Sequence, residues 1–202
     1  MKRILLFVVL ASCLFASSWM TAQTPPSDFD SNHVEIGAFA DYFRLATPTP
    51  AINFVGAGGR LAFNVHPNIQ LEAEMSYDFA RNFTTTFSNG VTTQFVRTNL
   101  RPLTGLFGPK FQAGTSGPVR VFITGKVGFV NFSTSNQSAT AGFTSSLGAI
   151  TTGETKVALY PGGGIEGFWG PFGLRLEGGD EIYFDSGTHN NLRVTFGPAF
   201  RF

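Results

Sequence analysis

Two glutamates, Glu72 and Glu74, stand two residues apart in the sequence, so both carboxylates point to the same side of an extended strand. Such a pair could serve as general acid and general base. The alternative is that both form ion pairs with nearby basic residues such as Arg60. The surrounding sequence favours ion pairs, because residues 69–79 alternate strictly between apolar and polar side chains, as a half-buried strand does.

The other motifs that suggest chemistry lack the context that the chemistry needs. Residues 162–167 satisfy the spacing G-x-G-x-x-G, but no strand-to-helix unit follows them, which argues against a dinucleotide site. The three histidines are scattered, so we expect no metal site. Asp185, Ser186 and His189 are the ingredients of a hydrolytic triad, yet such groups usually come from separate elements. The sequence therefore predicts no catalytic, cofactor or metal residues.

The composition excludes several classes of protein. Of the 202 residues only 27 are charged, or 13%, about half of the usual fraction of roughly 25%. Without Lys2 and Arg3, 12 basic residues face 13 acidic ones, so the chain lacks the positive charge of a nucleic-acid binder. Aromatic residues make up 14% of the chain, which argues against disorder.

The first 22 residues resemble a secretory signal peptide. Two basic residues precede an apolar run that is too short to span a bilayer, and small residues follow it. Residues 10–13 also match a lipoprotein lipobox, so Cys13 is either lipidated or removed with the signal. We predict a signal peptide over residues 1–22, a short extension over 23–32 and one domain over 33–202.

Alternation with a period of two residues dominates that domain and predicts an all-β fold. The segments with this pattern number eight and cover residues 34–42, 56–65, 69–79, 103–111, 119–129, 157–168, 174–184 and 192–202. Short connections at residues 66–68, 112–118 and 169–171 alternate with longer polar ones at 45–51, 80–90, 133–153 and 185–191. This alternation predicts an eight-stranded antiparallel up-and-down transmembrane barrel with its short turns at one end.

Which face is inside is a separate question, because a lipocalin-like soluble barrel keeps its apolar face within. The apolar face carries too many phenylalanines for a narrow interior, and aromatic residues gather near strand ends, as at Phe43, Trp169 and Tyr183. Both features favour a membrane barrel with a charged lumen. If residues 66–68 form a turn, Val65 opposes Ile69 and Arg60 opposes Glu74. The lumen ion pairs then draw on Arg60, Glu72, Glu74, Glu166, Arg175, Glu177 and Arg193, with Glu166 opposite Arg175.

The end of the chain carries a family resemblance. Phe196, Pro198, Phe200 and the final Phe202 share one face of the last strand, and together they look like the signal read by the outer-membrane assembly machinery. With the glycine-rich strand at residues 56–63, the chain resembles the OmpA/OmpX-like small outer-membrane β-barrels of Gram-negative-type bacteria. The resemblance implies eight antiparallel strands and roles from anchoring to adhesion, without the peptidoglycan-binding domain that often follows such barrels.

These features predict a non-enzymatic outer-membrane scaffold with a plugged, charge-paired lumen and loops that meet an extracellular partner. The alternatives are a narrow diffusion channel and a lipid-modifying outer-membrane enzyme. Arg97 and Arg101 have lipid-facing parity beyond the hydrocarbon span, so they either contact lipopolysaccharide phosphates or reach water at the rim. Asp180 also has lipid-facing parity, for which the sequence offers no reason. The expected partners are outer-membrane lipids, lipopolysaccharide and the assembly machinery, with no cofactor and no nucleic acid.

Overall fold

The structure is a computed structural model, and it describes residues 33–46, 51–88, 93–113, 118–136 and 155–202, with the side chains of 83–98 and 134–136 left out. Among these residues no helix is long and apolar enough to cross a membrane. The described residues form strands, whose bounds are β1 Val34–Leu45, β2 Ile52–His66, β3 Ile69–Asp78, β4 Arg81–Ser88, β5 Thr93–Ala113, β6 Val119–Asn136, β7 Thr155–Trp169, β8 Phe172–Phe184 and β9 Thr188–Arg201.

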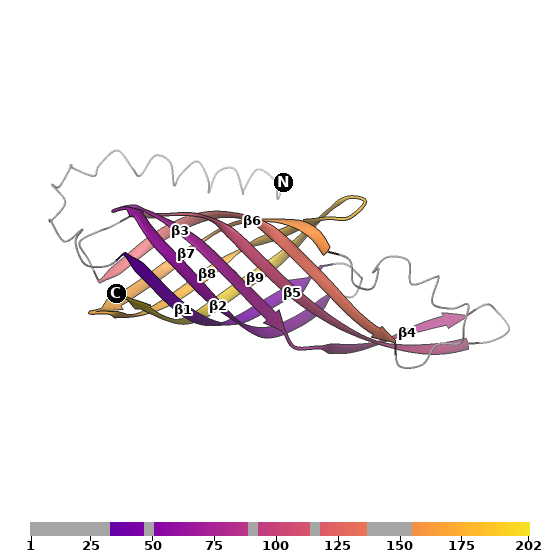
Figure 1. The fold of residues 1–202 in the computed structure, drawn as a ribbon. Coiled ribbons are helices and arrows are strands. Elements are labelled where there is room, and N and C mark those ends of the chain that lie inside the picture. The colour runs from indigo at the N-terminus through magenta and orange to yellow at the C-terminus, as the bar shows by residue number, and fades with distance from the viewer. Residues whose placement is uncertain (1–32, 47–50, 89–92, 114–117, 137–154) are drawn as a thin grey trace, which may run out of the picture.

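The strands close into a barrel in which each strand pairs antiparallel with its neighbours (Figure 1). The first and last strands, β1 and β9, pair with each other, and the pairing of β3 with β5 completes the ring. The short strand β4 also pairs with β5, directly beyond β3, so β3 and β4 share one position of the ring. The barrel therefore has eight strand positions in sequence order, which confirms the predicted fold.

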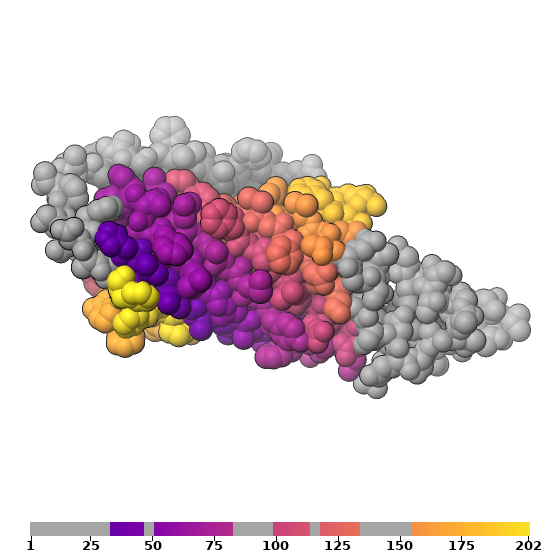
Figure 2. Space-filling view, viewed as in Figure 1, coloured from indigo at the N-terminus to yellow at the C-terminus, as the bar shows by residue number. Residues whose placement is uncertain are grey.

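One end of the barrel, which we call the turn end, holds the start of β1, the end of β9 and two short turns. Here the amide of Val34 donates to the carbonyl of Phe202 at 3.1 Å, and the amide of Phe202 donates back at 3.0 Å. Figure 2 shows the yellow end of the chain lying against the indigo start of β1. The connections β2–β3 and β7–β8 also lie at this end. Both are short, as predicted, but each contains two residues rather than the three expected, because His66 and Trp169 belong to strands. The opposite end we call the loop end.

Two of the predicted long loops are wrong. Residues 80–90 contain the strand β4, and β9 begins at Thr188, so only residues 185–187 connect β8 to β9. Both segments are rich in polar residues, which suggested loops. Threonine is β-branched and favours strands as well, and in β4 the pairing with β5 decides the outcome. The strict alternation of short and long connections therefore fails at β8–β9, where the turn is short at the loop end.

The register agrees with the two predicted cross-strand neighbours. Arg60 pairs with Glu74 across β2 and β3, and Glu166 pairs with Arg175 across β7 and β8. The prediction that Val65 opposes Ile69 is wrong, because His66 pairs with Ile69 and Val65 is displaced as a β-bulge. The bulge lies at the turn, so it leaves the register of the rest of the hairpin unchanged.

The barrel has its apolar face outside and its charges inside. Phe196 is 53% exposed on the outer face, whereas Glu72 and Arg193 are 0% and 1% exposed inside. A soluble barrel would show the opposite arrangement. The predicted inversion is therefore confirmed by the exposed side chains on the outside and by the buried acids Glu35, Asp41, Glu72, Glu74, Asp78, Glu166, Glu177 and Glu181 within.

The interior at the loop end is apolar, which the sequence reading missed. A buried cluster there, which we call the apolar cap, consists of Phe43, Leu45, Phe54, Leu100, Leu106, Val130, Phe132, Ala158, Tyr160 and Tyr183. Phe43 and Tyr183 were expected in an exposed aromatic belt and are instead buried in this cap. Near the end of a strand, parity alone decides whether an aromatic faces lipid or the lumen, and both residues have lumen parity. Trp169, in contrast, is 64% exposed on the outside at the turn end.

Candidate functional site: the charged barrel interior

The interior charges come from alternate residues of several strands, because every second side chain of a strand points inward. On β3 these residues include Glu72 and Glu74, and on β8 Arg175 and Glu177. The remaining strands add basic groups, among them Arg60 from β2 and Lys126 from β6. Residues distant in the sequence thereby meet in one buried layer at the middle of the barrel.

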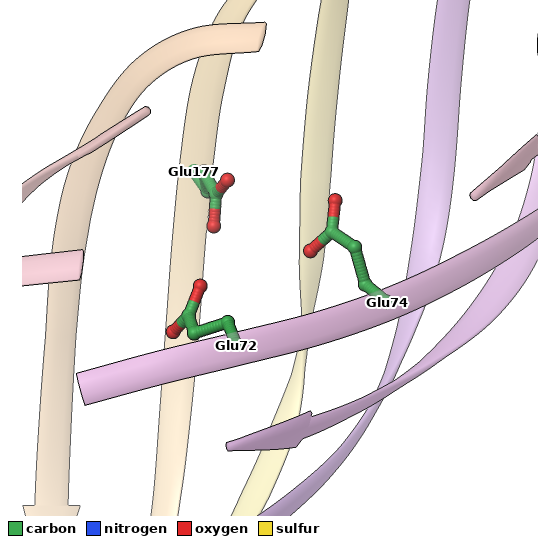
Figure 3. Close-up of side chains that lie close together, drawn as sticks. All are labelled: Glu72, Glu74 and Glu177. Atoms are coloured by element: carbon green, nitrogen blue, oxygen red, sulfur yellow. The ribbon is translucent and has the colours of Figure 1, made fainter. Parts of the chain in front are cut away.

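Three carboxylates lie at the centre of this layer. Glu72 and Glu74 point inward from β3 toward Glu177 on β8 (Figure 3), and one oxygen of each lies within 4.8 Å of the others. Carboxylates at such separations repel one another unless a cation lies between them. Their spacing is also compatible with a metal ion, which carboxylate oxygens of this kind can bind.

The ammonium group of Lys126 already fills that position. Its Nζ lies 2.8 Å from Glu74 Oε2, 2.8 Å from Glu177 Oε1 and 3.1 Å from Glu72 Oε2. An ammonium group has three hydrogens to donate, and it meets three carboxylates here. The three glutamates therefore form a lysine-centred ion cluster, in which the cation belongs to the protein itself.

Two arginines complete the cluster. Arg60 Nε donates to Glu74 Oε2 at 2.9 Å, and its Nη2 donates to Glu177 Oε2 at 3.1 Å. Arg175 binds Glu72 through both terminal nitrogens and donates from Nη2 to Glu177 Oε2 at 2.5 Å. Each carboxylate thus meets at least two cations, an arrangement that compensates for the loss of hydration.

A second cluster lies nearer the turn end. Lys110 Nζ lies 2.8 Å from Glu166 Oε2, and Arg201 Nη2 lies 2.9 Å from the other oxygen of Glu166. Arg201 Nε also donates to Glu35 at 2.9 Å. Glu166 and Arg175, predicted to pair, are cross-strand neighbours, but their side chains turn to different partners. The strand register determines that both side chains face the lumen at the same height. Packing in the lumen then determines which of several nearby opposite charges each of them contacts.

Aromatic rings inside the barrel cover several of these cations. The guanidinium carbon of Arg175 lies 4.1 Å from the ring centre of Phe122, and that of Arg201 lies 3.4 Å from Phe168. Arg60 stacks similarly on Phe39, at 5.0 Å. Such contacts favour a cation over the face of a ring. The rings have lumen parity in the sequence, but their pairing with these arginines depends on tertiary structure.

Arg193 links the central cluster to the loop end. Its Nε donates to Asp41 Oδ2 at 3.0 Å, its Nη1 to Glu74 Oε1 at 3.1 Å and its Nη2 to Ser76 Oγ at 3.1 Å. All seven residues predicted for lumen ion pairs therefore lie inside the barrel. The structure adds Lys110, Lys126, Arg201, Glu35 and Asp41 to them, all of which have lumen parity in the sequence.

The groups that suggested enzymatic chemistry are engaged otherwise. His189 Nε2 lies 3.0 Å from the backbone carbonyl oxygen of Asp185, and its ring stacks on Tyr183 with centres 4.8 Å apart. Ser186 takes no part in these contacts. The glycine-rich residues 162–167 lie within strand β7, as parts of the barrel wall.

Of the candidates with lipid-facing parity, the structure describes the side chains of Arg101 and Asp180. Arg101 is exposed, and its guanidinium carbon lies 5.1 Å from the ring centre of Tyr77. Arg97 lies on β5 opposite Thr84, and its side chain is outside the described part. Asp180 accepts a hydrogen bond from the amide of Asn191 at 2.8 Å, which gives this outward carboxylate one partner. At the other end of the barrel, the exposed residues of β9 and the chain end include Phe196, Pro198, Phe200 and Phe202.

Comparison with known proteins identifies the fold. No protein-family model matches the chain, and no curated protein sequence does. Among solved structures, Neisserial surface protein A matches with a TM-score of 0.55 and 9% identity over 84% of this chain and 97% of that one. The attachment invasion locus protein Ail of Yersinia pestis, in complex with the heparin analogue sucrose octasulfate, matches with a TM-score of 0.50 and 13% identity over 85% and 98%.

The N-terminal β-barrel domain of Pseudomonas aeruginosa OprF is a further match, with a TM-score of 0.47 and 16% identity over 85% of this chain and 98% of that one. The TM-scores of the first two structures show a common fold, and identities this low leave the function open. The chain has the fold of the small eight-stranded outer-membrane β-barrels, in agreement with the resemblance seen in its sequence.

Proposed function

We propose that this chain is an outer-membrane protein that acts as a structural and interaction scaffold, with a lumen that does not conduct. The observation that carries the proposal is the filled interior. Two ion clusters and the aromatic rings on them occupy the barrel from the turn end to its middle, and the apolar cap occupies the loop end. An eight-stranded barrel is just wide enough for side chains to fill it.

The location follows from the outer surface and the fold. Exposed apolar side chains such as Ile123, Val127 and Phe107 lie on the middle of the barrel wall, where a bilayer would cover them. Residues 1–22, which the structure leaves undescribed, supply the signal for secretion, and the turn end then faces the periplasm. The exposed aromatic residues at the end of β9 present the signal for the assembly machinery.

The interaction role rests on the loop end, which faces the outside in this orientation. Strand β5 has 21 residues, roughly twice the 9–11 that span the hydrocarbon, and with β4 it forms a ribbon beyond the ring of strands (Figure 1). In the described part of the chain, β4 pairs with β5 alone. Its other edge is therefore suited to accept a strand of an extracellular partner.

Arg97 and Arg101 are the proposed contacts to lipopolysaccharide. Arg101 is exposed at the loop end. Two further exposed arginines lie near Asn53 of β2: Arg44 on β1 is the cross-strand neighbour of Asn53, and Arg81 Nε donates to the carbonyl of Asn53 at 3.1 Å. Arginine suits phosphate because it donates two parallel hydrogen bonds. Arginines at this height therefore match the phosphates of the outer leaflet.

The lipopolysaccharide contact is tested by comparing the free energy of unfolding of the barrel with and without lipopolysaccharide, because a lipid that binds the folded barrel stabilises it. At about 1 kcal/mol per arginine near an anionic surface, Arg97→Ala with Arg101→Ala should weaken binding by about 2 kcal/mol, or roughly thirtyfold. Lys156→Ala is the matched control, because it also removes a cation, but from β7, where Lys156 pairs with Asp185 at 3.1 Å. Equal losses in the two variants would show that the arginine pair has no special role.

The scaffold proposal is tested by conductance of the refolded protein in planar bilayers. Folding is checked first by the different gel mobility of unboiled and boiled samples, and an added diffusion porin shows that the bilayer detects channels. We expect no steady current from the wild-type barrel. A steady open-channel current would instead support the diffusion channel. Altered lipid A that depends on His189 would support the lipid-modifying enzyme.

A further inference from the structure

Asp180 is the one acidic residue of the described strands whose side chain points outward. On β8 it lies between the outward-facing Gly178 and Ile182, and its cross-strand neighbour on β9 is Leu192, which is 50% exposed. The amide of Asn191 donates to Asp180 Oδ1 at 2.8 Å, but no cation among the described residues lies within ion-pair distance of this carboxylate. A carboxylate on the lipid face of a barrel is unfavourable, which points to a partner that neutralises it.

An open groove of about 370 Å³ lies beside this carboxylate on the outer wall. Its lining comes from two neighbouring strands, namely Gly178, Gly179 and Asp180 of β8 and Asn190, Asn191 and Leu192 of β9. Gly178 keeps the groove open, because a Cβ atom on it would meet no atom nearer than 3.9 Å. The groove therefore has room for a side chain that approaches the carboxylate from outside the barrel.

The chain carries a basic side chain in the same row of the outer wall. Arg44 of β1 is exposed, and its cross-strand neighbour is Leu192, the residue that neighbours Asp180 on the other side. Arg44 and Asp180 therefore flank β9, one on each side. Among the residues that the structure describes, no acid pairs with Arg44. One strand thus has an exposed positive group on one side and an exposed negative group on the other.

A two-fold axis brings these two groups together across two copies of the barrel. If the axis runs parallel to the barrel axis in front of β9, the β1 side of one copy faces the β8 side of the other. Arg44 of each copy then faces Asp180 of the partner subunit, which gives two equivalent ion pairs. Strands lie about 4.8 Å apart and tilt by about 40°, so Arg44 and Asp180 differ in height by about 6 Å. An extended arginine side chain covers that difference.

We propose that the barrel forms a two-fold dimer in the membrane through the outer face of β9, in which Arg44 of each copy enters the groove beside Asp180 of the partner subunit. The exposed Leu192 lies at the centre of this interface. The flanking residues Ala40 on β1 and Gly178 on β8 are small, so the two barrels can approach closely. The partner is a second copy because one surface supplies both halves of the charge pair. The dimer rests on the membrane location proposed above.

The test places a cysteine at the centre of the interface. In a chain with Cys13→Ser, Leu192→Cys lies near the axis and meets itself in the other copy, so oxidation should link two copies. Ile123→Cys is the matched control, because Ile123 is also exposed on the outer face but belongs to β6, three strands away from β9. The protein is refolded in vesicles at a low ratio of protein to lipid, and gel mobility of unboiled samples confirms folding. We expect a several-fold larger disulfide-linked fraction with Leu192→Cys than with Ile123→Cys.

Charge reversal shows whether Arg44 and Asp180 meet between two copies. Arg44→Glu alone and Asp180→Arg alone each place like charges opposite each other in both contacts of the dimer, so each should lower the linked fraction of Leu192→Cys by more than about tenfold. A mixture of the two variants should restore linking, because the new glutamate then faces the new arginine and Arg44 faces Asp180. A size tag on one variant identifies the mixed dimer.

Equal linking with Leu192→Cys and Ile123→Cys would overturn the proposal. So would a mixture of the charge variants that links no better than either variant alone, because a charge pair within one barrel cannot be restored by mixing. A barrel that refolds in vesicles with the expected gel mobility but gives these results is monomeric. That outcome refutes the dimer and leaves the scaffold proposal intact.

Discussion

Replacing Lys126 by methionine tests how much of the barrel's stability depends on neutralising its interior. Methionine fills a similar volume without the charge. It leaves Glu72, Glu74 and Glu177 with oxygens within 4.8 Å of one another and no ammonium between them. Arg60 and Arg175 still contact these glutamates, so the loss is partly compensated. Removing one partner of a buried ion pair typically costs about 3–5 kcal/mol, and we expect Lys126→Met to fall in that range.

A second substitution separates charge balance from packing. Glu74 is the best acid to remove with Lys126, because its other partners keep a carboxylate each: Arg60 retains Glu177, and Arg193 retains Asp41. The double variant Lys126→Met with Glu74→Gln should therefore have a free energy of unfolding that is more than about 1 kcal/mol higher than that of Lys126→Met alone. Simple additivity of the two single variants would contradict this reasoning.

The assay is urea unfolding of the barrel in lipid vesicles, followed by the fluorescence of Trp169, whose exposed position places it against lipid. Lys156→Met is the control. Its ion pair with Asp185 is partly exposed, so its loss should change the free energy of unfolding by less than about 1 kcal/mol. If Lys126→Met unfolds at the same urea concentration as the wild type, the ion cluster is not needed for stability.

Two further predictions concern the barrel wall. A Cβ atom on Gly128 would lie 1.8 Å from the carbonyl oxygen of Gly105, whereas Gly125 on the same strand has open space, so Gly128→Ala should lose about 1–3 kcal/mol in urea unfolding and Gly125→Ala should change little. Ile123 is 66% exposed on the lipid face of β6, and Ile123→Arg should lose about 2–4 kcal/mol in vesicles. Val65→Arg, at the turn end, should lose at most about 1 kcal/mol, and equal losses at both positions would mean that the bilayer does not cover Ile123.

The sequence alone was sufficient for the architecture. Alternation with a period of two assigns each residue to one of two faces, and a one-residue slip would exchange the faces, so the register of the Arg60–Glu74 and Glu166–Arg175 rows followed from the turns. The excess of phenylalanine on one face then decided which face is outside. Polar composition was a weaker guide, because threonine-rich segments such as β4 look like loops until their pairing with β5 is known.

Only the tertiary structure decided which charges meet. Parity places Lys126 and Glu177 in the lumen, but their contact depends on how the closed ring sets the height of β6 against β8, and the sequence within a strand does not encode that stagger. The same closure puts Phe43 and Tyr183 into the apolar cap. Local pattern fixes the direction of a side chain, whereas its partner is chosen by strands that meet only after the barrel closes.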